Sequence, residues 1–204
     1  MTLTFMGTGT SHGVPVVGCS CKVCTSDDER DRRYRSSAVV HGDHGETIVI
    51  DTGPEFRLQA LRAGLSSLDA VLVTHAHADH IHGLDDVRPL TRGHDLPVMA
   101  LPSDIREIRE RFSYAFRETQ AGGGKPRLKL SPVRSHSFVV GSILITPVPL
   151  LHGERTVLGF RLERHMAGTE RIADSGAIDT AAGTGMPGLA GGPVPQDVRA
   201  GAGG

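Results

Sequence analysis

The sequence predicts one α/β domain over residues 1–165, followed by a tail, residues 166–204, that lies outside it. Short apolar segments typical of strands alternate with segments of helical periodicity, which is the pattern of an α/β chain. A length of 204 residues is enough to build one hydrophobic core. The tail holds 10 Gly and 8 Ala in 39 residues and no aromatic residue, so we expect it to be mostly disordered.

The first half of the chain contains four expected strands and one expected helix. The strands are residues 2–6, 36–41, 47–51 and 69–74. Residues 7–35 are expected to form a long loop. A loop of this length within a compact domain needs either a function or a cross-link that holds it in place. Residues 54–63 predict a helix because Pro54 stands near its start and Gly64 just past its end. The run at 69–74 is continuously apolar, as expected of a strand buried on both faces.

The second half repeats this alternation. Strands are expected at residues 97–101, 133–140, 142–150 and 156–164. Ser103 is a candidate N-cap for the intervening helix. Ile105, Ile108, Phe112 and Phe116 recur at helical spacing and should face the core. Residues 122–126 are a flexible break before the last strands.

Charge and composition limit the classes of function. The formal net charge is −1, so no overall basic field favours nucleic acid as a partner. No apolar run is long enough to span a bilayer, and the N-terminus lacks the pattern of a signal peptide. We therefore expect a cytoplasmic protein that binds no membrane. Three cysteines within six residues fit a reduced thiol cluster better than a disulfide framework.

Four side chains of metal-ligand type follow the apolar run at 69–74, in the segment Thr74-His-Ala-His-Ala-Asp-His80. Residues two apart at the end of a strand point the same way, so His75 and His77 can meet one metal ion. Asp79 and His80 then turn toward a second position nearby. A solvated His-rich loop is the alternative, but this density of ligands is rare by chance.

This motif resembles the signature of the metallo-β-lactamase superfamily. Ile48–Gly53 resembles the strand and the aspartate, here Asp51, that brace the metal loop in that superfamily. Leu150–Gly153 resembles the segment that supplies a further ligand, here His152. The resemblance implies an αββα sandwich whose edge holds two divalent ions, Zn²⁺ or Mn²⁺. Asp79 would be both a ligand of the second ion and a catalytic proton shuttle.

The cysteine cluster narrows the resemblance. Cys19, Cys21 and Cys24 offer three thiolates, one short of a tetrahedral zinc site, so a fourth ligand must come from elsewhere or the thiols hold no metal. The cluster follows a Gly7-Thr-Gly loop and precedes Arg32–Ser37. These segments resemble phosphodiesterases that open phosphoribosyl cyclic phosphate, the PhnP-like group. The resemblance implies a structural zinc ion at the cysteines.

The family pattern breaks near the end of the chain. The superfamily has a bridging aspartate and a late histidine there, whereas no histidine follows His165. Asp174 lies near the expected position of the bridging aspartate, although the apolar strand expected before it is nearly absent; Asp179 is a weaker candidate. The end of the domain thus looks truncated or altered. We expect this form to be poorly stable and nearly inactive.

The function predicted from the sequence is a two-metal phosphodiesterase that uses a metal-bound hydroxide on a small cyclic or nucleotide-like phosphate. The alternatives are a transfer-RNA 3′-end endonuclease, which would need a basic arm, a thioesterase of the glyoxalase type, and a metal-binding remnant without activity. A homodimer is left open. Two or more bound ions would favour the enzyme, and one or none the remnant.

Overall fold

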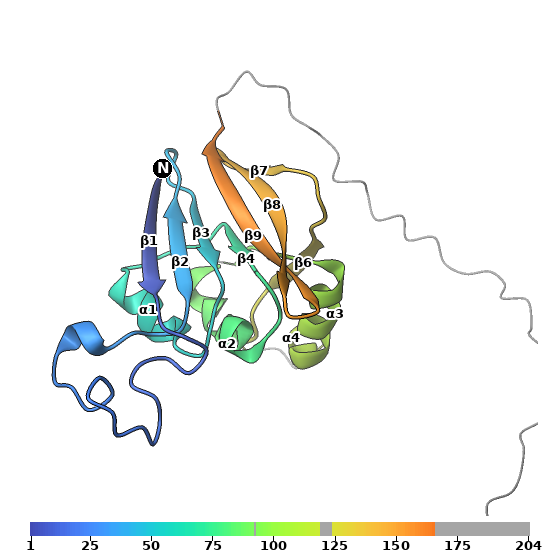
Figure 1. Ribbon diagram of the computed structural model, residues 1–204. Helices are drawn as coiled ribbons and strands as arrows, with labels where there is room; N and C mark the ends of the chain where they lie inside the picture. The colour runs from blue at the N-terminus through green and yellow to red at the C-terminus, as the bar shows by residue number, and fades with distance from the viewer. Residues whose placement is uncertain (92, 119–123, 166–204) are drawn as a thin grey trace, which may run out of the picture. The chain divides into compact units, whose positions relative to one another are not determined.

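The computed structural model describes residues 1–91, 93–118 and 124–165, and these residues form two β-sheets and a layer of helices (Figure 1). The tail expected to be disordered, with Asp174 and Asp179, lies outside the described residues. None of the helices in the described ranges has both the length and the apolar character needed to cross a membrane.

The larger sheet has six strands that follow one another in chain order. They are β1 (Thr2–Gly7), β2 (Ser37–His41), β3 (Thr47–Ile50), β4 (Ala70–Leu72), β5 (Leu96–Ala100) and β6 (Leu128–Pro132). The first three pair antiparallel, and β3 to β6 pair parallel. The carboxyl ends of β3 and β4 therefore lie side by side at one edge of the sheet, where loops can bring side chains together.

The smaller sheet has three antiparallel strands, β7 (Phe138–Val140), β8 (Ile143–His152) and β9 (Arg155–Arg164). A two-residue turn joins β8 to β9, and Gly153 in that turn has a φ of 62°, a conformation that glycine adopts without strain. His152 and Arg155 are the last paired residues before the turn.

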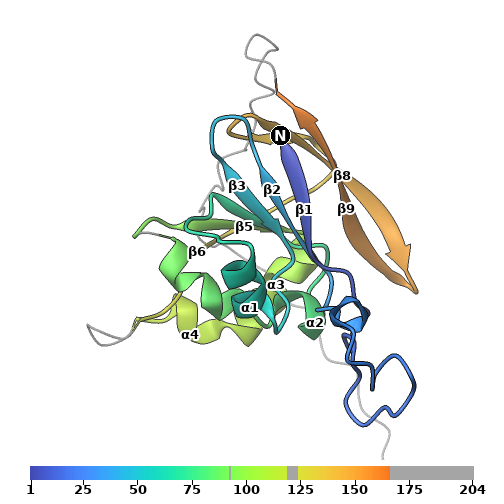
Figure 2. The ribbon, with the colours of Figure 1, turned by 90° about the vertical axis from the view of Figure 1, so that its left-hand side faces the viewer.

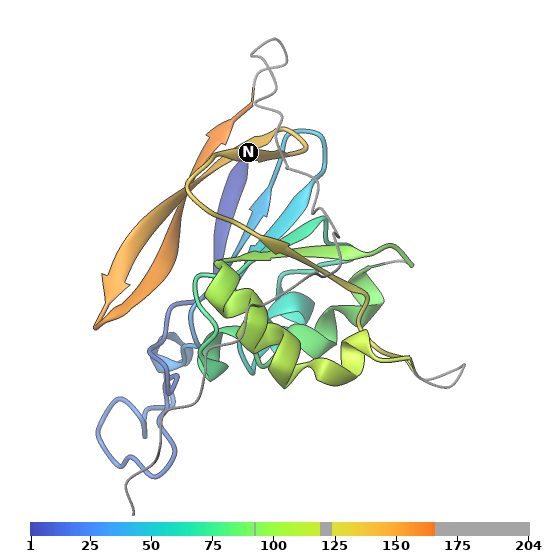
Figure 3. The same cartoon turned by 90° about the vertical axis from the view of Figure 1, so that its right-hand side faces the viewer.

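The helices lie on one face of the six-stranded sheet, and the β7–β9 sheet lies on the other (Figures 2 and 3). The helical segments are α1 (Phe56–Arg62), α2 (Ala78–Ile81), α3 (Pro102–Arg111) and α4 (Ser113–Phe116), with 3-10 turns η1 (Glu29–Asp31) and η2 (Leu84–Leu90). This is an α-β-β order of layers. In the described ranges no helix covers the outer face of the smaller sheet.

Two hydrophobic cores hold these layers together. Val49, Val71 and Val98 point toward the helices and pack with residues such as Phe56 and Ile108. The opposite face of the sheet packs against Ile143 and Ile145 of the smaller sheet, and its buried residues are Val40, Ile48, Ala70 and Leu72. Strands β3 and β4 thus contribute to both cores, and for β4 this confirms the burial on both faces that the apolar run at 69–74 predicts.

The structure corrects two local expectations. Strand β6 at 128–132 is absent from the sequence prediction, and only Phe138–Val140 of the expected strand 133–140 pairs in a sheet. Helix α3 begins at Pro102 with Leu101 as its N-cap, so Ser103 does not cap it. Proline is favoured at the first helical position because the N–H that it lacks would have no helical partner there, and the helix therefore starts two residues earlier than expected.

Candidate metal centre

Asp51 braces the start of the loop that carries the histidines. It follows β3 directly and has a φ of 60°, which few residues other than glycine adopt. Its Oδ1 accepts the backbone N–H of Thr74 at 2.8 Å, and its Oδ2 accepts the Thr74 hydroxyl at 2.8 Å. The carboxyl ends of β3 and β4 are thereby linked through one buried carboxylate.

Three histidine rings converge beside this brace. Each of His75, His77 and His152 has a ring nitrogen within 4.8 Å of those of the other two. Nε2 of His75 lies 3.0 Å from Nδ1 of His77. The ring centroid of His152 lies 5.5 Å from that of His75, although the two residues come from different sheets. Three imidazole nitrogens at this separation fit a divalent ion such as Zn²⁺.

Asp79 and His80 lie in α2, immediately after this loop. Nε2 of His80 is 3.2 Å from Oδ2 of Asp79, and the ring centroid of His80 is 4.1 Å from that of His75. An imidazole and a carboxylate thus stand next to the three-histidine cluster, as a second ion would require. Asp174 and Asp179 lie outside the described residues.

The surroundings set the protonation of two of these rings. Burial lowers the pKa of His75 to about 4, and the charges of His80, His77 and His152 act in the same direction. A neutral imidazole is the form that binds a metal ion. Burial would also lower the pKa of His80, but its hydrogen bond with Asp51 and the charges of Asp51 and Asp79 outweigh that cost and raise it.

Two glycines allow α2 to pack against the end of β3. The N–H of Thr52 donates to the carbonyl of His80 at 2.7 Å, and the N–H of Gly83 donates to the carbonyl of Thr52 at 2.8 Å. A Cβ at Gly53 would lie 2.3 Å from the carbonyl oxygen of Asp79, and one at Gly83 would lie 2.1 Å from that of Gly53. Larger residues would push the candidate ligands apart.

A charged network that the sequence analysis does not anticipate lies beneath the loop. Asp104, fully buried in α3, accepts the N–H of Ala76 at 3.1 Å. Arg111 donates to the carbonyl of the same alanine. Arg155 of β9 donates to Asp104 and, at 2.5 Å, to Glu107. In the sequence, Asp104 looks like any acidic residue in the first turn of a helix, so no local signal marks it.

The cysteines form a second cluster. The Sγ atoms of Cys19, Cys21 and Cys24 lie within 4.8 Å of one another, and the cluster contains no fourth ligand from the described residues. The N–H of Val16 points to Sγ of Cys24 at 3.3 Å. A backbone hydrogen bond from Cys24, helped by the Cys19 thiol, lowers the pKa of Cys21 to about 7, which favours the thiolate that binds zinc.

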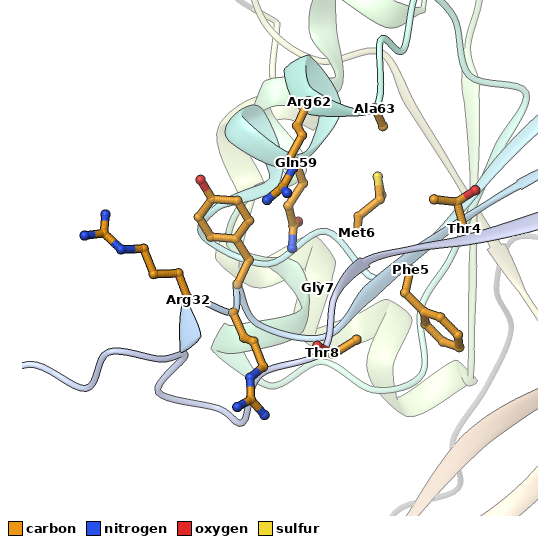
Figure 4. Close-up of a pocket in the computed structure, with 11 residues that line it drawn as sticks. Thr4, Phe5, Met6, Gly7, Thr8, Arg32, Gln59, Arg62 and Ala63 are labelled. Atoms are coloured by element: carbon orange, nitrogen blue, oxygen red, sulfur yellow. The ribbon is translucent and has the colours of Figure 1, made fainter. Parts of the chain in front are cut away.

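A cavity of about 320 Å³ lies elsewhere, at the free edge of β1 (Figure 4). It is lined by Gly7 and by α1 residues such as Gln59 and Arg62, and Arg32 stands at its side. No histidine of the cluster lines it. The cavity is therefore not part of the candidate metal centre.

Residues 46–189 match the family described as Beta-lactamase superfamily domain. A curated relative from Porphyromonas gingivalis, named octanoyltransferase, is 44% identical over 163 residues, which are 79% of this chain and 33% of that protein. A solved structure described as a new diphosphatase from the PhnP family has a TM-score of 0.71 and 42% identity, and the match covers 78% of this chain and 61% of that chain.

The fold is also shared with a more distant protein. Zn²⁺-bound PqqB from Methylobacterium extorquens has a TM-score of 0.63 at 18% identity, and the match covers 80% of this chain and 62% of that chain. This chain thus spans about a third of the curated relative and about 60% of each solved structure.

Proposed function

This chain belongs to the metallo-β-lactamase superfamily, and from that premise we propose that it is a metal-dependent phosphodiesterase with two divalent ions, Zn²⁺ or Mn²⁺. Its substrate would be a small cyclic or nucleotide-like phosphate. The reduced cysteines fit a cytoplasmic setting, which is part of the proposal.

One observation carries the proposal: the convergence of three imidazoles from two sheets beside a fourth imidazole and a carboxylate. His75, His77 and His152 would hold one ion, and Asp79 and His80 would contribute to the second. When bound, such ions lower the pKa of water and offset the negative charge on phosphate oxygens. The donor set suits this role, because imidazole and carboxylate are ligands of both zinc and manganese.

The protein's own groups supply orientation and proton transfer. Asp51 fixes the ring of His80 through Nδ1, which leaves Nε2 directed toward Asp79. Asp79 has a side chain that is 22% exposed, so it can reach a substrate and exchange a proton with solvent. The buried Ala76 places no bulk between His75 and His77.

The relatives support phosphate chemistry over acyl chemistry. The solved structure at 42% identity is described as a diphosphatase of the PhnP family. The name octanoyltransferase belongs to a protein of which the matched region is one third, so acyl transfer is not assigned to this chain.

The test is the dependence of hydrolysis on the ion. The altered end of the domain should keep turnover low, but we expect the chain to cleave bis(p-nitrophenyl) phosphate slowly when Mn²⁺ or Zn²⁺ is added, and to lose this activity after dialysis against a chelator. His77→Ala should show the same loss with the ion present. The proposal would be refuted if the wild-type chain with the ion hydrolysed the substrate no faster than the metal-free chain or His77→Ala.

A further inference from the structure

His152 is the least supported member of the histidine cluster. It is exposed, and in the described part of the chain its ring has no hydrogen-bond partner. His75, in contrast, is buried and lies 3.0 Å from the hydroxyl of Thr74 through Nδ1. The position of His152 therefore depends on how the β8–β9 hairpin is held against the rest of the site.

The hairpin is attached to the histidine loop at two points. The N–H of Leu158 in β9 donates to the carbonyl of Thr74 at 2.8 Å. The second attachment is Arg155, which stands directly across from His152 in the strand register and reaches Asp104 and Glu107 in α3. The second attachment is nearer to His152 along the hairpin, so it controls that ring more directly.

Asp104 connects this attachment to the other two histidines. The same oxygen, Oδ1, accepts the Arg155 guanidinium and the backbone N–H of Ala76. Ala76 lies between His75 and His77 in the chain, and Arg111 holds its carbonyl. The other oxygen, Oδ2, is buried and has no partner among the described residues. A single carboxylate oxygen thus touches both segments that carry the candidate ligands.

We propose that Arg155 is a positioning residue that holds His152 against His75 and His77 through its contact with Asp104. The proposal rests on the proposed function, because it assumes that the three histidines bind a metal ion. Within the described residues, the hydrogen bonds and ion pairs of the Arg155 side chain go to Asp104 and Glu107 and to none of the three rings. It acts by fixing the end of the hairpin, as polar partners outside the ligand set do in other metal sites.

Titration with Co²⁺ tests this role in the full chain. Visible absorption reports Co²⁺ at the histidine centre, and circular dichroism reports independently that each variant is folded. We expect Arg155→Met to weaken Co²⁺ at the histidine centre by roughly 10- to 100-fold. Arg155→Lys should recover part of the loss. Arg161→Met is the matched control on the same strand, since its side chain is 68% exposed, and it should bind as the wild type does.

The coupling to His152 separates positioning from general stabilisation. In a His152→Ala background, Arg155→Met should cost less than about 2-fold, because the ring that it positions is already gone. Arg155→Met leaves a buried carboxylate unpaired and could unfold the chain. Asp104→Asn combined with Arg155→Met avoids that charge, and this pair should also bind Co²⁺ weakly.

The results distinguish the two proposals. Normal Co²⁺ binding by Arg155→Met or by the paired variant overturns the role of Arg155 and leaves the proposed function intact. The role of Arg155 is also overturned if Arg155→Met weakens Co²⁺ binding by the same factor in the His152→Ala background as in the wild-type chain. No Co²⁺ signal from the histidine centre of the wild-type chain would overturn both proposals.

Discussion

Nδ1 of His80 lies 2.7 Å from Oδ2 of Asp51, so the residue that follows β3 orients a candidate ligand in α2. The same carboxylate accepts two hydrogen bonds from Thr74, which precedes His75. One buried aspartate therefore fixes both the start and the end of the histidine loop. Its left-handed backbone conformation directs the carboxylate to this position.

Asp51→Asn should weaken metal binding without distorting the backbone. Asparagine tolerates a φ of 60°, but it lacks the negative charge that orients His80. We expect Zn²⁺ affinity to fall roughly 10- to 100-fold, measured by competition with a chelating dye. Asp51→Ala should lose as much affinity and unfold more easily, since alanine in this conformation costs about 1–2 kcal/mol more. Equal Zn²⁺ affinity in Asp51→Asn and wild type would show that the brace is dispensable.

Asp79→Ala should remove most of the hydrolytic activity, because it takes away a ligand of the second ion and a group that can transfer a proton. We expect kcat for bis(p-nitrophenyl) phosphate to fall by roughly 10²- to 10⁴-fold. Asp95→Ala is the control, since Asp95 is exposed and its ion-pair partner among the described residues is Arg127 at the surface. Unchanged turnover in Asp79→Ala would exclude a mechanism that uses this carboxylate.

Gly83→Ala should destabilise the protein. Its Cβ would lie 2.1 Å from the carbonyl oxygen of Gly53 and 2.6 Å from Cβ of Phe56, and both belong to packed backbone or core. We expect the free energy of unfolding to fall by about 1–3 kcal/mol in urea. Gly124→Ala is the control, because the nearest atom to its Cβ would be a flexible guanidinium 3.5 Å away. A loss no larger than that of the control would mean that α2 can shift freely.

Glu46 should contribute a pH-dependent part of the stability. It joins the two sheets, because its carboxylate accepts the N–H of Ser142 at 2.5 Å and the Ser142 hydroxyl at 3.0 Å. Burial would raise the pKa of Glu46, but hydrogen bonds from its own amide and from Ser142 lower it overall. Its contribution is therefore present above the unfolded pKa of about 4.3 and is lost as pH falls through the lower folded pKa.

Glu46→Gln should thus lower the free energy of unfolding by about 1 kcal/mol at pH 7. The difference from wild type should shrink below about pH 4, where the wild-type carboxylate is also protonated. Urea denaturation at several pH values measures this. Glu163→Gln, at an exposed surface pair with Arg161, should show almost no difference at either pH. A Glu46→Gln deficit that persists at pH 3 would assign the effect to packing instead of charge.

Much of the fold follows from the sequence because its signals are local. The apolar run at 69–74 and the alternating segments before it predict the central strands, and the structure pairs them as β2, β3 and β4. Strand β6 was missed because Leu-Lys-Leu-Ser-Pro is short and sits among prolines, which are poor strand signals. Its pairing with β5 depends on tertiary contacts that no local pattern shows.

The residues of the site also fall into two groups, those that the sequence identifies and those that it does not. The His-x-His-x-Asp-His motif marks itself by the density of its ligands, and the place of His152 followed from a resemblance to family segments. The roles of Asp104 and Arg155 could not be predicted, because they meet across 51 residues of chain and neither belongs to a motif. The candidates Asp174 and Asp179 lie outside the described residues and stay predictions.

The central claim is that the three converging histidines hold a divalent ion, and anomalous X-ray scattering at the zinc edge tests it most directly. A crystal of the chain grown with Zn²⁺ should show a peak between the ring nitrogens of His75, His77 and His152, and a separate peak at the cysteine cluster. Peaks confined to the cysteines, with none among the three histidines, would contradict the account.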